Sequence, residues 1–106
     1  MGIVITIPAD EAQAIRSRDT DDQPSLQQLQ DIVDGYIEQV PGWIEYIGIP
    51  CVVYCNEEGK QRGLPVNQRA TRLWWDKLGG GAFDDVLCGD IVVVVGLPDK
   101  DEEEDE

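Results

Sequence analysis

The stretch Gly89-Asp90-Ile91-Val92-Val93-Val94-Val95-Gly96 holds five consecutive apolar, β-branched residues between two glycines. Such residues favour extended backbone because their branched side chains pack well on a pleated surface. A strand with one face in water alternates apolar and polar residues, so an unbroken run indicates a strand covered on both faces. We therefore expect residues 91–95 to form a central strand of a sheet.

A strand and a helix are predicted in the first half of the chain. The residues from Ile3 to Ile7 are mostly β-branched and are followed by Pro8, which predicts a strand. Residues 9–24 are polar and acid-rich, and we interpret them as a loop with one or two helical turns near 11–16. A capping box of Ser25 and Gln28, followed by apolar residues at helical spacing, predicts a helix from residue 25 to residue 40 that packs on the sheet.

The second half predicts two more strands and a second helix. Residues 43–49 and 51–55 are rich in aromatic and β-branched residues, so they form two strands, or one strand bent at Pro50. Residues 56–59 form a turn. The stretch 66–78 predicts a helix, which Asn67 caps and the glycines at 79–81 end.

The predicted order is strand, helix, two strands, helix, strand, within a single α+β domain over residues 1–98. This order matches a ferredoxin-like arrangement, although a different α+β sheet topology fits equally well. Residues 99–106 contain seven acids and one lysine. Because such a segment has no apolar surface to bury, we expect it to be disordered.

Composition excludes several classes of function. The 106 residues suit one domain, and 22 acids against 8 bases give a net charge of −14. Direct binding to DNA, RNA or an anionic membrane is not expected, because affinity for phosphates needs clustered Lys and Arg. No apolar run is long enough to span a membrane. Without histidine, Ser-His-Asp and Cys-His catalytic sites and most zinc sites are excluded.

The cysteines and an acidic loop predict neither a disulfide nor a metal site. Four residues of strand place Cys51 and Cys55 about 13 Å apart, beyond the reach of a disulfide. With Cys88 they are expected to be reduced thiols in the cytoplasm, and no fourth soft ligand accompanies them. Residues 19–22 resemble the start of a calcium loop, but Pro24 replaces the required glycine, so we expect a solvated loop and no cofactor.

A basic window interrupts the acidic chain. Five bases and a single acid lie between Lys60 and Lys77, where the net charge is +4. Arg69 and Arg72 share a helix face, and they serve either local ion pairs or a site for an anion. Of the adjacent Trp74 and Trp75, one is expected in the core and the other near the surface. The candidate binding residues are Asn67, Arg69, Thr71, Arg72 and Trp75.

Ordered sequence blocks resemble a known family. The blocks are Asn56-Glu57-Glu58-Gly59-Lys60, Gly63-Leu64-Pro65, Asn67, Ala70-Thr71, Asp85-Val86, Gly89-Asp90-Ile91-Val92-Val93-Val94 and Gly96. Over roughly residues 26–96 the chain is similar to domain of unknown function three-eight-four-six, whose members are small proteins of bacteriophages, plasmids and their bacterial hosts. The resemblance implies a setting but no activity. It suggests that the following residues matter to the fold or to a shared surface: Asn56, Gly59, Pro65, Asn67, Ala70, Thr71, Gly89 and Asp90.

Three functional hypotheses follow from these features. The first is a non-enzymatic protein that binds and inhibits a protein in the host cytoplasm, with an acidic surface that imitates nucleic acid. The second is a binder of a small ligand or nucleotide around Asn67, Arg69, Thr71 and Arg72. The third is an enzyme, but no residue pattern points to a catalytic acid or base, so we expect none. The oligomeric state stays open, and a homodimer is compatible with the sequence.

Overall fold

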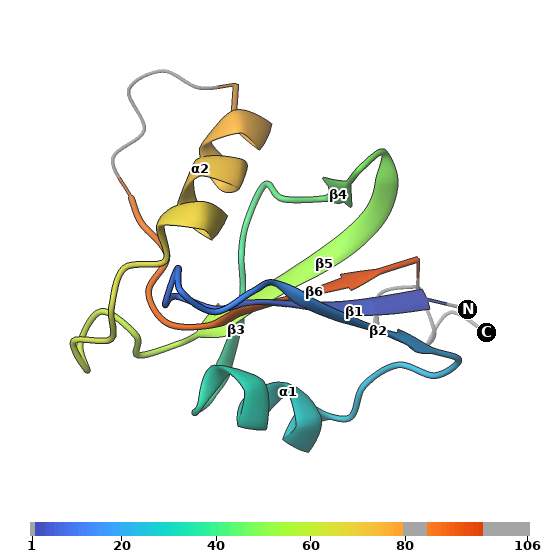
Figure 1. Cartoon of the computed structure of the whole chain (residues 1–106), viewed down its shortest axis with the longest axis horizontal. Coiled ribbons are helices and arrows are strands. Elements are labelled where there is room, and N and C mark those ends of the chain that lie inside the picture. Colours follow the sequence, from blue (N-terminus) through green and yellow to red (C-terminus); the bar gives the residue numbers. More distant parts are fainter. Residues whose placement is uncertain (1, 80–84, 97–106) are drawn as a thin grey trace.

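A computed structural model describes residues 2–79 and 85–96 of the chain. Within these residues the order of elements contains six strands and two helices (Figure 1). They are β1 (Gly2–Ile7), β2 (Arg16–Thr20), α1 (Leu26–Val33), β3 (Ile37–Gln39), β4 (Glu45–Tyr46), β5 (Ile49–Asn56), α2 (Gln68–Lys77) and β6 (Ile91–Val95). The acidic segment 99–106, which the sequence predicts to be disordered, lies outside the described residues, as do Gly80 and Gly81.

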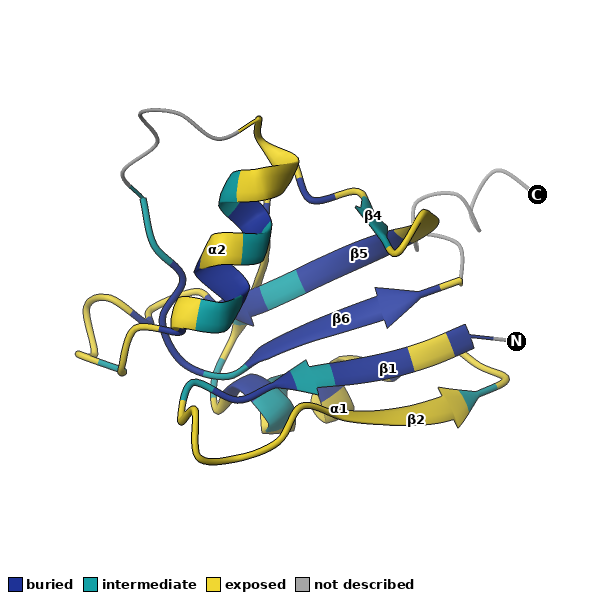
Figure 2. Cartoon of the chain, turned by 45° about the horizontal axis from the view of Figure 1, so that its top comes forward, coloured by how far each residue is buried: buried dark blue, intermediate teal, exposed yellow. Residues whose placement is uncertain are grey.

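The strands form an antiparallel sheet with the order β2-β1-β6-β5-β3, and β4 pairs with the first residues of β5. β6 lies between β1 and β5, with Val93 opposite both Ile5 and Val53. All five residues of β6 are buried (Figure 2). The prediction of a central strand at 91–95 is therefore confirmed.

The two helices cover opposite faces of this sheet (Figure 1). Alternate residues of a strand point to opposite faces, so β6 contributes to two separate cores. Ile91, Val93 and Val95 pack in one core with α2, while Val92 and Val94 pack in the other with α1. This two-sided burial is the physical reason that the run contains no polar residue.

The α+β class is confirmed, but the ferredoxin-like arrangement is not the one observed. That arrangement is a split β-α-β unit, in which strands joined through a helix run parallel. Here β5 and β6, the strands that α2 joins, are direct antiparallel neighbours in the sheet, and an additional strand, β2, follows β1. The chain has the other kind of α+β topology that the sequence left open.

β2 corrects the interpretation of residues 9–24 as a loop with helical turns. Residues 16–20 pair with β1 in a regular antiparallel register, Val4 lying opposite Arg18. The strand shows no apolar alternation because four of its five residues are exposed and the fifth is half-buried. Backbone pairing with β1 holds this segment in place, and polarity patterns do not report such pairing.

The first helix is shorter than predicted. The capping box of Ser25 and Gln28 is present, but α1 ends at Val33, and Ile37 to Gln39 form a strand beside β5. The side-chain amide of Asn56 donates to the carbonyls of Val33 and Asp34, each at 3.0 Å. These bonds satisfy the last helical carbonyls, and Asp34 in left-handed backbone turns the chain away. Hence Tyr36, Ile37 and Val40, which the helical spacing included, belong to no helix.

Residues 43–56 form a hairpin whose turn differs from the one predicted. Of the two interpretations, the two-strand one is confirmed, but the chain reverses at Ile47-Gly48 and Pro50 lies inside β5. The helix predicted over 66–78 is α2, one or two residues shorter at each end. All three cysteines are buried free thiols, as predicted.

Asn67 connects three parts of the fold. Its side chain is fully buried, and its amide donates to the carbonyl oxygens of Ile7, at 2.7 Å, and Gly89, at 3.0 Å. Its side-chain oxygen accepts from the Ala70 N–H at 3.0 Å, which caps α2 as predicted. The end of β1, the approach to β6 and the start of α2 are therefore fixed by one side chain.

Replacing this side chain tests its role. Asn67→Ala removes the cap and leaves buried backbone groups without partners, so we expect the free energy of unfolding to fall by about 2–4 kcal/mol. The matched control is Gln68→Ala at the exposed next position, which changes stability by less than about 0.5 kcal/mol. Urea denaturation of both variants measures the difference, and equal stabilities would contradict this account.

Candidate functional site

Two of the five predicted binding residues are structural. Asn67 has no exposed surface, and Thr71 is only 3% exposed. The Thr71 hydroxyl accepts from the Leu87 N–H at 3.0 Å, so it holds the segment before β6 against α2. The polar atoms of both side chains therefore already serve the fold.

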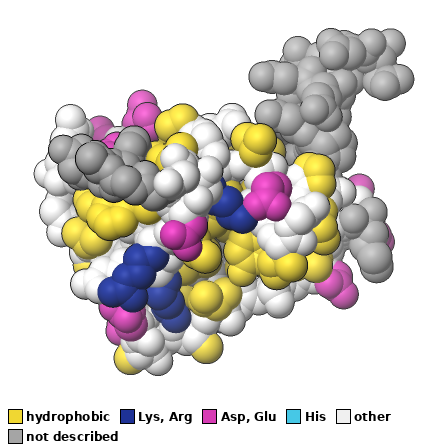
Figure 3. All heavy atoms as spheres, turned by 90° about the horizontal axis from the view of Figure 1, so that it is seen from above, with side chains coloured by type: hydrophobic (Ala, Val, Ile, Leu, Met, Phe, Trp, Pro, Cys, Tyr) yellow, Lys and Arg dark blue, Asp and Glu magenta, His cyan; other side chains and the backbone are white. Residues whose placement is uncertain are grey.

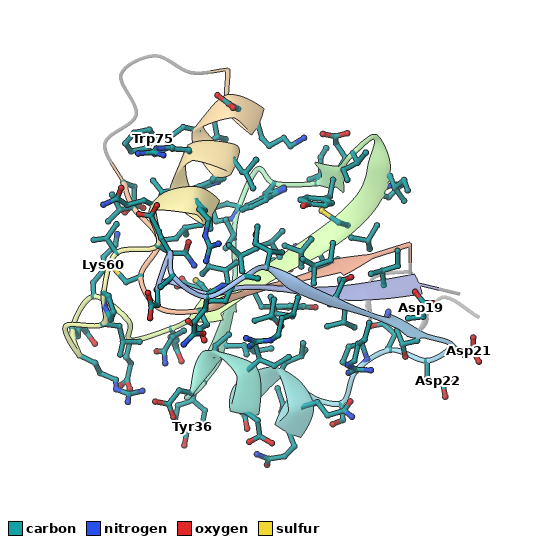
Figure 4. The ribbon with its side chains drawn as sticks, in the orientation of Figure 1. Asp19, Asp21, Asp22, Tyr36, Lys60 and Trp75 are labelled. Atoms are coloured by element: carbon teal, nitrogen blue, oxygen red, sulfur yellow. The ribbon has the colours of Figure 1, made fainter. Side chains whose placement is uncertain are left out.

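The other three predicted residues lie at the surface of α2. Arg69 is half-buried and donates through Nη2 to the carbonyls of Pro8, at 2.7 Å, and Asp10, at 3.1 Å. Arg72 is exposed, and its one described contact is with the Gln68 side chain at 3.4 Å. Trp75 projects from α2 (Figure 4) and donates from its indole to the Asp85 carbonyl at 2.8 Å.

The paired tryptophans divide as predicted. Trp74 is buried, 2% exposed, and its indole N–H donates to the carbonyl of Pro41 at 2.7 Å. Trp75 is half-buried and packs against the same core from outside. The prediction of one tryptophan in the core and the other near the surface is confirmed.

Carboxylates partner three of the five bases in the basic window. Lys60 pairs with Asp85 and Lys77 with Glu45, while Arg62 Nη2 lies 3.4 Å from a carboxylate oxygen of Asp34. The mutual hydrogen bond raises the pKa of Lys60 and lowers the pKa of Asp85. Figure 3 shows basic side chains next to acidic ones on this face. Of the two roles considered for this window, the contacts favour local ion pairs.

A cavity of about 310 Å³ lies between β5, α2 and residues 85–88. Its lining includes the thiols of Cys55 and Cys88, the ring of Trp74 and the Lys60–Asp85 pair. Burial raises the pKa of Cys55 to about 11, and the nearby Glu38 carboxylate adds to the shift. The thiol is therefore protonated at neutral pH and is a poor nucleophile.

Within residues 2–79 and 85–96, no group of three or more acidic or cysteine side chains has the geometry to hold a metal.

The hairpin of β4 and β5 exposes three isoleucines. The exposed fractions are 72% for Ile44, 80% for Ile47 and 45% for Ile49. Single exposed apolar residues are ordinary, but adjacent ones create a surface that water solvates poorly. We call Ile44, Ile47 and Ile49 the hairpin surface. The sequence did not reveal the hairpin surface. Its β-branched composition predicts a strand at residues 43–49, and this composition cannot distinguish a buried strand from an exposed turn.

Ile47 also has an unfavourable backbone conformation. Ile47 and Gly48 form a two-residue turn with φ of 53° and 76°, which is the geometry that Asn-Gly sequences favour. A β-branched residue with positive φ is an outlier, and left-handed backbone costs an L-residue roughly 1–2 kcal/mol. Glu45 stabilises this turn by accepting from the Gly48 N–H at 2.8 Å. The same carboxylate binds Lys77 of α2, so the hairpin is fixed to the helix.

The comparison with family models identifies the family. The model of a domain of unknown function, DUF3846, matches residues 3–106. The chain belongs to the DUF3846 family. The match extends beyond the residues 26–96 over which the blocks are recognisable and includes β1 and β2. No curated protein and no solved structure matches the chain.

Residues that the DUF3846 resemblance singles out make internal contacts. Asn56 binds the end of α1, and the Gly89 N–H donates to the Pro65 carbonyl at 2.8 Å. The Asp90 carboxylate accepts from the Ala9 N–H at 3.0 Å. Together with Asn67 and Thr71, these residues connect the ends of strands to the loops beside them. Of the two roles that the resemblance allows, the fold or a shared surface, these contacts support the fold.

Neither described helix has the length and apolarity that crossing a membrane requires.

The raised pKa values of two thiols predict how the stability of this DUF3846 protein depends on pH. Burial raises the pKa of Cys51 and of Cys55 from 9.0 to about 11. Between these values the unfolded chain loses thiol protons that the folded chain keeps, so stability falls as pH rises. Each thiol lowers the free energy of unfolding by up to about 2 kcal/mol between pH 9 and pH 11.

Urea denaturation at pH 8.5 and pH 10.5 measures this dependence. We expect the Cys51→Ala/Cys55→Ala double variant to lose less stability between the two pH values than the unchanged protein. Val53→Ala, a buried truncation in the same strand, is the control, because it lowers stability at both pH values and keeps their difference. A double variant with the unchanged pH dependence would refute the assignment.

Proposed function

We propose that this protein is a non-enzymatic binding protein that attaches to another protein through the hairpin surface. The observation that carries the proposal is an isoleucine at a turn tip, 80% exposed, at positive φ. Neither folding nor solubility favours this residue at this position, since asparagine would suit the backbone and the solvent better. A contact with a partner gives the apolar side chain a role. Outliers of this kind are found at functional sites.

The charge of the chain favours a basic partner. A net charge of −14 repels other acidic surfaces and attracts basic ones. Apolar anchors surrounded by polar residues are typical of protein interfaces, where a few buried side chains supply most of the binding energy. We therefore propose a partner with an apolar cleft inside a basic surface.

The biological setting of the proposal comes from the family resemblance. Phages and plasmids act in the cytoplasm of a bacterial host, so we propose a host protein as the partner and its inhibition as the outcome. A basic channel that normally holds nucleic acid fits the acidic body of this chain, which in that case imitates phosphates. The nucleotide alternative has less support, because Asn67 and Thr71 are buried and engaged in internal hydrogen bonds.

The experiment is capture of partners from host lysate with the tagged protein, followed by quantitative mass spectrometry. Ile47→Asn removes the apolar contact and relieves the turn, so we expect a protein as stable as the original, or more stable by about 1 kcal/mol, that captures its partner at least tenfold less. Thermal unfolding of the variant confirms that the fold is kept.

Tyr36→Asn is the matched control. Tyr36 is also an exposed large side chain, but it lies beside α1, on the opposite side of the sheet from the hairpin (Figure 4). Capture by this variant should equal that of the unchanged protein. Retention of the partner at high salt indicates that apolar contact dominates, and its loss at high salt indicates that the acidic surface dominates. No partner in either condition, or equal capture by Ile47→Asn, would reject the proposal.

A further inference from the structure

β2 forms an open edge of the sheet, far from the hairpin surface. It is the last strand in the order β2-β1-β6-β5-β3, and its other side has no partner strand in the described part of the chain (Figure 2). Four of its five residues are exposed, so neither a helix nor a loop covers it. An antiparallel edge strand offers alternate backbone N–H and C=O groups to a further strand.

The side chains of β2 divide by charge between the two faces of the sheet. Opposite residues in an antiparallel pair point to the same face, and Arg18 lies opposite Val4, which packs in the α1 core. Arg16 is two residues away and shares that face. Ser17 and Asp19 point to the α2 face. The edge therefore presents two positive charges on one face and a negative charge on the other.

Arg16 and Arg18 are the arginines whose side chains have no partner within residues 2–79 and 85–96. Arg62 pairs with Asp34, Arg69 binds backbone carbonyls, and Arg72 contacts Gln68. The side chains of Arg16 and Arg18 make no hydrogen bond or ion pair with any residue that the structure describes. In a chain with 22 acids, two neighbouring guanidinium groups without a partner among the described residues are an unexpected arrangement.

A cleft of about 330 Å³ lies beneath these arginines. Val4 and Thr6 of β1 line it together with Ile32 of α1, Ser17 and the two arginines. Its surface is more apolar than polar, so it suits the stem of an acidic side chain whose carboxylate reaches a guanidinium. Arginine binds carboxylates with paired, charge-assisted hydrogen bonds.

We propose that β2 is a docking edge for an extended acidic segment of another protein. The segment adds to the sheet as an antiparallel strand, and backbone hydrogen bonds to β2 supply sequence-independent affinity. Carboxylates at two alternate positions of the segment lie opposite Arg16 and Arg18. This interaction is separate from the proposed function of the hairpin surface and does not depend on it.

The register of β2 argues against a second copy as the occupant. A second copy paired about a two-fold axis through the middle of β2 would place Arg18 opposite Arg18, two like charges. The chain's own acidic residues 99–106 follow β6, which β1 separates from β2, and the deletion variant below tests them as the occupant. A separate acidic strand can approach Arg16 and Arg18 from the open side.

The test uses an eight-residue synthetic peptide of alternating glutamate and valine as the probe. We expect it to slow amide hydrogen exchange in β2 and to shift the nuclear magnetic resonance signals of β2 residues, with no change at the hairpin. The matched peptide of alternating lysine and valine should do neither. Replacing the glutamates of the peptide by glutamine should weaken binding at least fivefold without any change to the protein.

Arg16→Glu/Arg18→Glu should weaken binding of the acidic peptide at least tenfold, whereas Arg72→Glu should leave it unchanged. The double variant alters only exposed side chains, and its thermal unfolding checks the fold. Three outcomes would overturn the proposal. These are equal binding of the acidic and basic peptides, a dimer in sedimentation that Arg18→Glu disrupts, and faster exchange in β2 after deletion of residues 99–106 alone.

Discussion

The buried amide of Asn67 is the constraint from which the arrangement of this fold follows. A fully buried amide must satisfy its donors and its acceptor, and here it does so with the carbonyls of Ile7 and Gly89 and the N–H of Ala70. These groups belong to the end of β1, the approach to β6 and the start of α2. Because all three must meet at one point, α2 can lie only on the face of the sheet that it covers.

Covering the sheet on both faces determines which surfaces stay open. The central strand β6 has a helix on each side, and the helices are short, so neither reaches the whole sheet. The β4–β5 hairpin exposes Ile44, Ile47 and Ile49, while β2 forms an edge of the sheet with two exposed arginines. The two surfaces have different chemistry, one apolar and one cationic, within a strongly acidic chain. These two surfaces are the basis of the two binding interactions that we propose.

The basic window shows why charge along a sequence predicts a site poorly. Lys60, Arg62 and Lys77 each have a carboxylate partner from another element, and Arg69 binds carbonyls of the β1–β2 connection. None of these partners is close in sequence, so only the fold brings them together. The guanidinium groups without a partner in the described part of the chain are on β2, where the sequence shows two arginines among aspartates and gives no reason to single them out.

Local sequence patterns were enough to predict the elements whose cause is local. The unbroken run at 91–95 required a doubly covered strand, Ser25 with Gln28 began a helix, and Asn67 capped another. Tertiary structure decided the rest. The first helix ends at Val33 because Asn56, a residue of β5, binds its last carbonyls, and β2 exists because β1 lies beside it. Both depend on contacts between residues distant along the chain, which no local pattern of polarity records.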